Sequence, residues 1–256
     1  MIQLEIKDGV AKITLDRPDK YHSFIREMAL KMQELLEQCN KDDSVRAILI
    51  TAKGKAFCAG QDLIEATDPN GPELTQIVQE HYNPIIRKIR KIEKPIISAV
   101  NGVAAGAGAS IALCCDIVVA KESASFIQAF SKIGLIPDSG ATFFLPRFIG
   151  MQRATALMMS ADPVSASDAL SMGMIYKVFA DDIFEQESWK LAIKLASLPT
   201  KGLGLTKRLL NSSYSNNLDQ QLDMEKECQS IAGETNDYKE GVEAFLEKRK
   251  PIFKGN

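Results

Sequence analysis

The residues best placed to do chemistry are two short turns rich in glycine and alanine. Ala59 and Gly60 follow one apolar stretch, and residues 106–108 (Gly-Ala-Gly) follow another that spans 95–100. Amides at the start of a helix lack partners within the chain, and small side chains let a ligand approach them. One amide from each turn could converge on a carbonyl oxygen, lowering a reaction barrier by roughly 3 kcal/mol per donor.

An acid or base must accompany such a pair of donors, and Asp138 is the best candidate. It lies in an apolar loop, directly after Ile136 and Pro137. Loss of hydration there would raise its pKa toward the value that a proton-transferring carboxyl needs. The alternative is that Asp138 caps the helix that begins at residue 139 or 140. Of the other carboxylates, we expect Asp62 to shape its turn and Asp116 to start a strand at the sheet edge.

The glycine and alanine segment also allows other interpretations. Residues 96–115 carry no charge, and this uncharged segment is as long as a membrane span. Polar residues interrupt the stretch, and Lys94 and Asp116 bracket it without an asymmetric basic flank, so we expect no span. A dinucleotide-binding fingerprint fits poorly, because Ile111 stands where the third glycine belongs. Close packing of a helix on a strand, with no ligand, stays open.

Other catalytic groups are scarce. Ser110 has only two histidines to pair with, His22 and His81, and both lie in the first third of the chain. We therefore expect neither a serine triad nor a histidine-rich metal site. Five cysteines, an odd number without a CxxC pair, indicate free thiols in a reducing cytoplasm. Cys114 and Cys115 lie in an apolar helix and are expected to pack in the core.

The composition is that of an ordinary globular protein. The chain has 256 residues, of which 45% are hydrophobic and 25% charged, enough for one large domain or a domain with an appendage. A net charge of -2 without a long basic run argues against a nucleic-acid surface. The first six residues have the pattern of a strand rather than of a signal peptide. We expect a cytoplasmic protein.

Strand and helix patterns alternate along the chain up to about residue 180, and these elements would bring the candidate residues together. The expected strands span 2–6, 10–15, 45–51, 96–100, 116–120, the neighbourhood of 126, and 178–179. The expected helices span 23–40, 74–92, 106–114, 141–149, 153–160 and 165–172, the last capped by Ser165. From 185 to 250 the pattern is helical, with breaks at Pro199 and near Asn216. This shift indicates a domain boundary or a helical extension for oligomer contacts.

Five motifs resemble, in order, those of the crotonase (enoyl-CoA hydratase/isomerase) superfamily: residues 17–20, 56–63, 101–108, 116–120 and 134–140. The resemblance implies an α/β fold built as a spiral of ββα units. It divides the chain into a core at 1–195 with the active site and a C-terminal helical oligomerisation region at 196–256. It also implies a homotrimer, or a hexamer made as a dimer of trimers, that acts on an acyl-CoA thioester. No cofactor beyond the coenzyme A of the substrate, no metal, no nucleic acid and no membrane is implied.

The same resemblance assigns roles to individual residues. The thioester oxygen would accept hydrogen bonds from the amides of Ala59 and Ala107, and Asp138 would be the catalytic acid and base. Tyr21 and His22 stand where the family commonly has Leu and Asn. The residues implied to bind coenzyme A or the acyl group are Lys20, Tyr21, His22, Cys58, Gly60, Gln61, Asp62, Leu63, Phe130 and Phe143.

Departures from the family pattern indicate the reaction. Hydratases of this superfamily carry two glutamates, at the positions where this chain has Ser110 and Phe130. Asp138 instead matches the aspartate of several isomerases. The stretch 102–140 is most similar to the ring 1,2-epoxyphenylacetyl-CoA isomerases of phenylacetate breakdown, which also shift double bonds in enoyl-CoA esters.

The resemblance therefore implies an acyl-CoA isomerase. It would move a double bond in an enoyl-CoA, or convert a ring-epoxidised phenylacetyl-CoA to the oxepin, through a thioester enolate with one aspartate as acid and base. Phe130, Phe143 and Phe144 would exclude water. One alternative is an enoyl-CoA hydratase that recruits another carboxylate. The other is a non-catalytic homologue that binds acyl-CoA; RNA binding is disfavoured, because the short basic cluster at 87–94 has the pattern of a solvated helix end.

Overall fold

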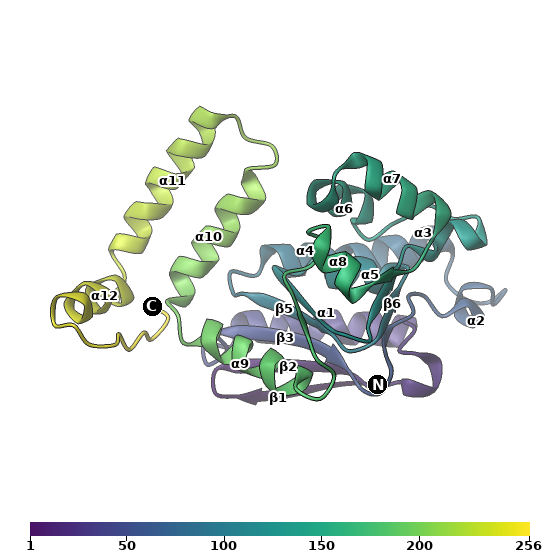
Figure 1. The fold of residues 1–256 in the computed structure, drawn as a ribbon, viewed down its shortest axis with the longest axis horizontal. Coiled ribbons are helices and arrows are strands. Elements are labelled where there is room, and N and C mark those ends of the chain that lie inside the picture. The colour runs from purple at the N-terminus through teal and green to yellow at the C-terminus, as the bar shows by residue number, and fades with distance from the viewer.

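The strands form two sheets in the computed structural model, which describes residues 1–256 (Figure 1). The larger sheet has the order β1-β2-β3-β5-β7-β10 and the smaller one the order β4-β6-β8-β9. The strands of the larger sheet are β1 (Ile2–Lys7), β2 (Val10–Leu15), β3 (Ala47–Ala52), β5 (Ile96–Val100), β7 (Ile117–Lys121) and β10 (Lys177–Phe179). Those of the smaller sheet are β4 (Ala56–Cys58), β6 (Val103–Ala105), β8 (Ser125–Ile127) and β9 (Val164–Ser165).

The predicted N-terminal hairpin is confirmed. Strands β1 and β2 pair antiparallel from Ile2 opposite Leu15 to Lys7 opposite Val10. The turn uses Asp8 and Gly9, both with positive φ, which matches the twist of the two strands. Beyond the hairpin, β2, β3, β5, β7 and β10 pair in parallel.

The central strands β3 and β5 are buried along nearly their whole length because both faces of the sheet are covered. Helices α1 (Arg26–Lys41) and α4 (Asn83–Lys91) and the smaller sheet enclose the main core on one face. Helix α9 (Phe184–Ala196) covers part of the other face with Phe184, Ala192 and Ala196. These central strands are therefore continuous apolar segments in the sequence.

The chain repeats one unit along the sheets. Strands β3, β5 and β7 each pass directly into β4, β6 and β8 of the smaller sheet, and a helical segment follows each pair. This repetition is the expected spiral of ββα units. The sequence pattern missed β4, β6 and β9, because strands of two or three residues carry too short an alternation. It also misplaced Asp116, since β7 lies inside the sheet and β10 forms its edge.

The helices agree with most expected ranges. They are α2 (Leu63–Ala66), α3 (Leu74–Gln76), α5 (Ala107–Leu113), α6 (Ala141–Ile149), α7 (Met151–Ser160) and α8 (Ala166–Ser171), in addition to α1, α4 and α9. Ser165 caps α8 as predicted, accepting from the amide of Asp168. The expected helix at 74–92 is interrupted by a π-helical turn, η2 (Ile77–Tyr82), and 3-10 turns lie at η1 (Pro18–Lys20) and η3 (Ala129–Ile133). No helix has the length and apolarity needed to cross a membrane.

Three C-terminal helices project from the sheet layers as an arm (Figure 1). They are α10 (Thr200–Ser212), α11 (Leu218–Gly233) and α12 (Asn236–Leu246), and they confirm the breaks predicted at Pro199 and near Asn216. Lys207 of α10 is buried and lies 2.8 Å from Oδ2 of Asp116. Arg90 reaches Oδ1 of the same carboxylate at 3.2 Å. This half-buried carboxylate is one of several groups that attach the arm to the core, together with Glu93, which pairs with Lys201 and Arg208.

Candidate active site

Two segments that are far apart in sequence lie side by side at the candidate site. The Phe24 amide donates to the Gly60 carbonyl at 2.7 Å, and the Asp62 amide donates to the Phe24 carbonyl at 2.8 Å. These bonds are those of a parallel strand pair. The two segments predicted to bind coenzyme A, 20–22 and 58–63, are therefore neighbours.

The predicted role of Ala59 is contradicted by this pairing. Its amide donates to the Tyr21 carbonyl at 2.9 Å, so it is not available to a thioester oxygen. The sequence pattern could not show this, because the partner carbonyl belongs to a turn 38 positions earlier and its direction depends on the positive φ of Tyr21.

The amide of Gln61, two residues further on, has no acceptor in the chain. In the parallel pair, the Gly60 carbonyl and the Asp62 amide point toward Phe24, so the N–H of Gln61, which lies between them, points away. The amide of Ala107 is the first of α5 and has no acceptor within that helix. It lies 3.2 Å from the position that a Cβ on Gly60 would occupy. Gln61 and Ala107 thus present one unused amide each beside the same glycine.

This close approach requires small residues. A Cβ on Gly108 would lie 2.3 Å from the Cys58 carbonyl oxygen, which is far inside contact distance. The two glycine turns named from sequence are therefore in direct contact, and close packing of the helix on the strand is part of what builds the site.

The side chain of Gln61 is held at both ends. Its Oε1 accepts from the Tyr82 hydroxyl at 3.0 Å, and its Nε2 donates to Oε2 of Glu65 at 2.9 Å. Both carboxylate oxygens of Glu65 also accept from the Arg26 amide. Burial first, and then the nearby Cys58, Asp138 and Glu65, raise the pKa of Tyr82 well above its usual value, which keeps the hydroxyl a donor.

Two predicted binding residues have structural partners instead of free polar atoms. Nδ1 of His22 accepts from the Arg17 amide at 2.9 Å, and its Nε2 lies 2.7 Å from the Lys53 carbonyl. Asp62 pairs with Arg17 at 2.7 Å and caps α2, as expected for a residue that shapes its turn. Burial alone would raise the pKa of Asp62, but the bonds from Arg17 and Ile64 lower it.

The other predicted binding residues of these segments differ in accessibility. Lys20 and Tyr21 are exposed. Cys58 is buried, and its thiol donates to the His22 carbonyl at 3.3 Å. Leu63 is exposed at the start of α2.

Asp138 is half-buried in the loop that follows η3. Burial raises the pKa of its carboxyl, and a hydrogen bond from Ser139 partly offsets the effect. The helix-cap alternative is not supported: α6 begins after Gly140 and receives no side-chain cap, and Asp138 contributes only its backbone carbonyl, to Ala141. The carboxyl is therefore free for another role.

The loop is placed against α4. A Cβ on Gly140 would lie 3.6 Å from Ile86 of α4, one turn beyond Tyr82. The Asp138 charge acts on Tyr82, which in turn bonds Gln61. The carboxyl thus lies within electrostatic range of the tyrosine that holds Gln61.

Both positions that hold glutamate in the hydratases have no ionisable group here. Ser110 is 1% exposed, and its hydroxyl donates to the Gly106 carbonyl at 3.2 Å. Phe130 is buried, with its ring 4.0 Å from the Cβ position of Gly106. Phe143 packs edge-on against Phe144 and Tyr214, with Arg147 above its ring.

Sequence reasoning missed Tyr82, Ser139 and the amide of Gln61. Only Ser139 had a signal, its position directly after Asp138. Tyr82 reaches Gln61 from a π-helical turn, which no periodicity in the sequence indicates.

Comparison with known proteins agrees with this geometry. The family model for enoyl-CoA hydratase/isomerase matches residues 5–256. The 1,2-epoxyphenylacetyl-CoA isomerase of Escherichia coli is 48% identical, over 98% of this chain and 97% of its own. A Rhodobacter capsulatus protein named "Probable enoyl-CoA hydratase" is 40% identical, over 99% of this chain and 98% of its own.

Solved structures extend the comparison to the fold. A crystal structure of an enoyl-CoA hydratase from Polaromonas sp. JS666 superimposes with a TM-score of 0.93 at 32% identity, covering 98% of this chain and 99% of its own. The chain belongs to the enoyl-CoA hydratase/isomerase family, the crotonase superfamily. It is an enzyme of that family, and its relatives carry the names of both isomerases and hydratases.

Proposed function

We propose that this enzyme is an acyl-CoA isomerase with Asp138 as its single acid and base. The observation that carries the proposal is a half-buried carboxyl with a raised pKa, while the two hydratase positions hold Ser110 and Phe130. The 48% identity to a 1,2-epoxyphenylacetyl-CoA isomerase supports the same reaction class.

The proposed substrate is an acyl-CoA thioester whose carbonyl oxygen accepts from the amides of Gln61 and Ala107. These donors stabilise negative charge as it develops on that oxygen, at roughly 3 kcal/mol each. Asp138 removes a proton from C2 of a 3-enoyl-CoA, which gives a dienolate. The protonated carboxyl then returns the proton to C4, which leaves the double bond between C2 and C3. One carboxyl suffices, because it acts first as base and then as acid.

A ring-epoxidised phenylacetyl-CoA is the second proposed substrate, since it forms an enolate at the same carbon before the epoxide opens to the oxepin. Neither reaction requires a cofactor beyond the coenzyme A of the substrate. Lys20 and Tyr21, which are exposed beside the site, are proposed to contact coenzyme A.

Hydration needs a second carboxylate to activate water, and Glu65, which accepts from Gln61, is one candidate. Its oxygens already accept from Arg26 and Gln61, which supports isomerisation over hydration. The test is turnover of the purified enzyme on 3-enoyl-CoA, 2-enoyl-CoA and epoxyphenylacetyl-CoA esters. Isomerisation with little hydration is expected, and Asp138→Asn should lose it while still binding acyl-CoA. Near-normal turnover by that variant would refute the role of Asp138. Binding without turnover of any ester would favour the non-catalytic homologue.

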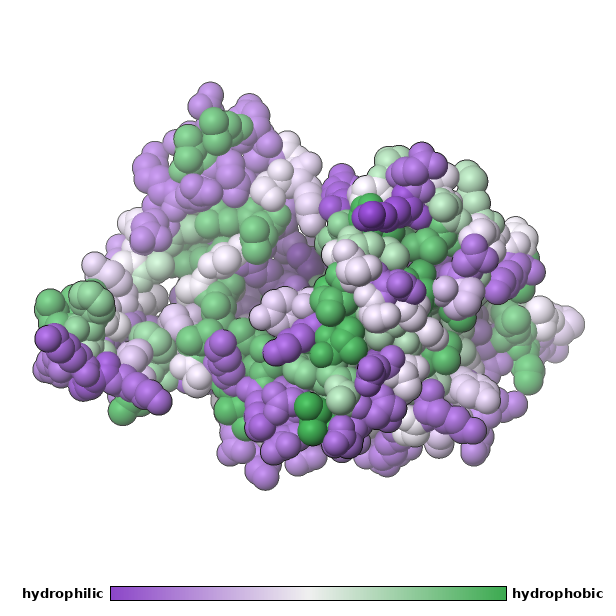
Figure 2. All heavy atoms as spheres, in the orientation of Figure 1, coloured by the Kyte–Doolittle hydropathy of each residue, from purple (hydrophilic) through white to green (hydrophobic).

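We also propose that the arm of α10, α11 and α12 associates with copies of itself, giving a trimer or a dimer of trimers. Figure 2 shows apolar atoms gathered over these helices. Exposed apolar side chains there include Leu218, Leu222, Phe245, Leu246 and Ile252.

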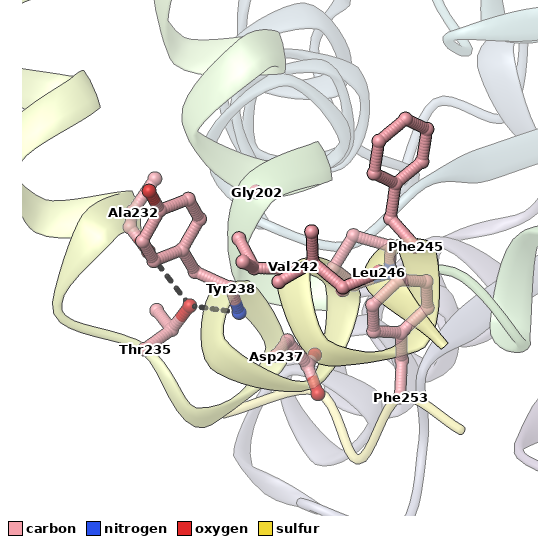
Figure 3. A pocket seen from close by; sticks show the side chains of 11 residues that line it. Gly202, Ala232, Thr235, Asp237, Tyr238, Val242, Phe245, Leu246 and Phe253 are labelled. Carbon is pink, nitrogen blue, oxygen red and sulfur yellow. Dashed lines mark hydrogen bonds between the residues drawn. The ribbon is translucent and has the colours of Figure 1, made fainter. Parts of the chain in front are cut away.

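A cavity of about 500 Å³ opens between α10, α11, α12 and the C-terminal tail. Figure 3 shows Val242, Leu246 and Phe253 together on one wall of it. Single exposed apolar side chains are common on protein surfaces, but a contiguous apolar surface of this kind supports burial against another subunit.

A further inference from the structure

Ser139 has a backbone conformation that its residue type disfavours. Its φ is 53°, in the left-handed region, and Gly140 follows with φ 77°. A residue with a Cβ is strained there, whereas glycine is not. The side chain is 2% exposed, so it gains nothing from contact with water. A serine at this position needs a reason other than the turn.

The reason is its hydroxyl. It donates to Oδ1 of Asp138 at 2.8 Å, a bond to an ionised acceptor and therefore stronger than a neutral one. No side chain donates to the second oxygen, Oδ2. The bond fixes the rotation of the carboxyl group and distinguishes its two oxygens.

We propose that Ser139 is a positioning residue, which holds Oδ1 of Asp138 so that Oδ2 faces the substrate and transfers the proton. This inference rests on the proposed function of Asp138. The strained backbone places the hydroxyl where it can reach the adjacent carboxyl, and a glycine at position 139 would form the same turn without it.

We expect the neighbouring ionisable groups not to obscure the titration of Asp138 in the acidic limb of the pH profile. In addition to burial, Cys58, from β4, and Asp138 both contribute to raising the pKa of Tyr82, from η2. Burial raises the pKa of Tyr82 well above its usual value and that of Cys58 to about 12. Glu65, from α2, also acts on Tyr82 but is engaged by Arg26 and Gln61. A shift in the acidic limb of the pH profile therefore reports on Asp138.

The test uses three variants of the full chain. Ser139→Gly removes the hydroxyl and relieves the strain, and Ser139→Ala removes the hydroxyl and keeps the strain. Ala161→Gly is the control, because Ala161 is also buried with φ 53° but lies at the end of α7. Measurements are kcat and KM as functions of pH, and the thermal unfolding midpoint.

Both Ser139 variants should show the same kinetic change. We expect kcat to fall about tenfold, the size of one hydrogen bond to a charged group. KM should change less than twofold, because the hydroxyl does not touch substrate. The acidic limb should move up by about one pH unit, because the lost bond stabilised the charged carboxyl. The thermal unfolding midpoint should instead depend on the backbone strain at positive φ. Ser139→Gly and Ala161→Gly relieve that strain, so their midpoints should match or exceed that of the parent. The midpoint of Ser139→Ala, which keeps the strain, should not.

Two outcomes overturn the inference. One is a Ser139→Gly enzyme whose kcat is within about twofold of the parent's and whose acidic limb lies within about 0.3 pH units of the parent's. The other is kinetics that follow stability, with Ser139→Ala impaired and Ser139→Gly normal. If Asp138→Asn is itself active, the proposed function fails as well; if Asp138→Asn is inactive and the Ser139 variants are normal, only the present inference fails.

Discussion

The hydroxyl of Tyr82 donates to Oε1 of Gln61 across 3.0 Å, so a residue of a π-helical turn holds the residue that carries a candidate oxyanion amide. Tyr82 is 1% exposed and its hydroxyl stays protonated. The donor geometry is therefore set before substrate arrives, which is the condition under which such donors stabilise a developing charge. π-Helical turns are frequent at functional sites, and here the turn positions one donor.

Replacing Tyr82 by Phe should reduce kcat more than it changes KM. The variant leaves Oε1 of Gln61 without its donor and lets the peptide that carries the amide move. We expect kcat to fall about tenfold, the equivalent of about 1.4 kcal/mol. Tyr214→Phe is the matched control, because the Tyr214 ring packs on Phe143 and its hydroxyl makes no hydrogen bond. Equal kinetics for the two variants would contradict the role of Tyr82.

Asp138→Asn should stabilise the fold near pH 7. The folded-state pKa of Asp138 is raised, so ionisation is penalised in the native state and stability falls as the pH rises from the unfolded value, about 3.9, through the folded value. Asparagine removes that penalty. Urea unfolding at pH 7 and at pH 3 should show a gain at pH 7 only. A gain of equal size at both pH values would show that charge is not its cause.

Gly108→Ala should disrupt the site. The added Cβ would lie 2.3 Å from the Cys58 carbonyl, so the turn at 58–61 or the start of α5 must shift. We expect a destabilisation of about 2 kcal/mol and at least tenfold lower activity. Gly233→Ala lies at the end of α11, where the added Cβ would meet no atom of another segment within 4 Å. It should be neutral or stabilise the fold by up to about 1 kcal/mol. Denaturant unfolding of both variants decides the comparison.

Asp116→Asn should loosen the C-terminal arm. It leaves the Lys207 ammonium buried without a counter-charge, at a cost of about 3 kcal/mol. Adding Lys207→Met should recover part of the loss, because the unpaired charge is then gone. Limited proteolysis within α10 to α12, with thermal unfolding, measures the effect. A double variant that is less stable than Asp116→Asn would disprove the account.

Phe245→Glu with Leu246→Glu should reduce self-association. Phe245 is 82% exposed on α12, and a carboxylate cannot be buried at an apolar interface without a large penalty. Sedimentation velocity should show a smaller species than the parent. Phe245→Leu, which keeps the surface apolar, should sediment like the parent. An unchanged assembly in the double glutamate variant would place the interface elsewhere.

Most elements of the fold, and the residue types at the candidate site, could be predicted from local sequence patterns. Alternating and helical periods are local properties, so the hairpin at 2–15, the strands at 96–100 and 116–120 (117–121 in the structure) and the C-terminal helices followed from them. Residue types alone placed small residues at the turns and a carboxyl at Asp138, and excluded a carboxyl at Ser110 and Phe130.

Which amide is free, and which side chains hold it, depends on how distant segments of the chain pack together. Ala59 and Gln61 lie in the same turn, and what separates them is the pairing of that turn with residues 21–24, which uses one amide and leaves the other. Tyr82 joins the site through a π-helical turn, and Ser139 through a positive φ. Hydrogen bonds between distant segments depend on direction as well as residue type, and direction is set by how the whole chain packs.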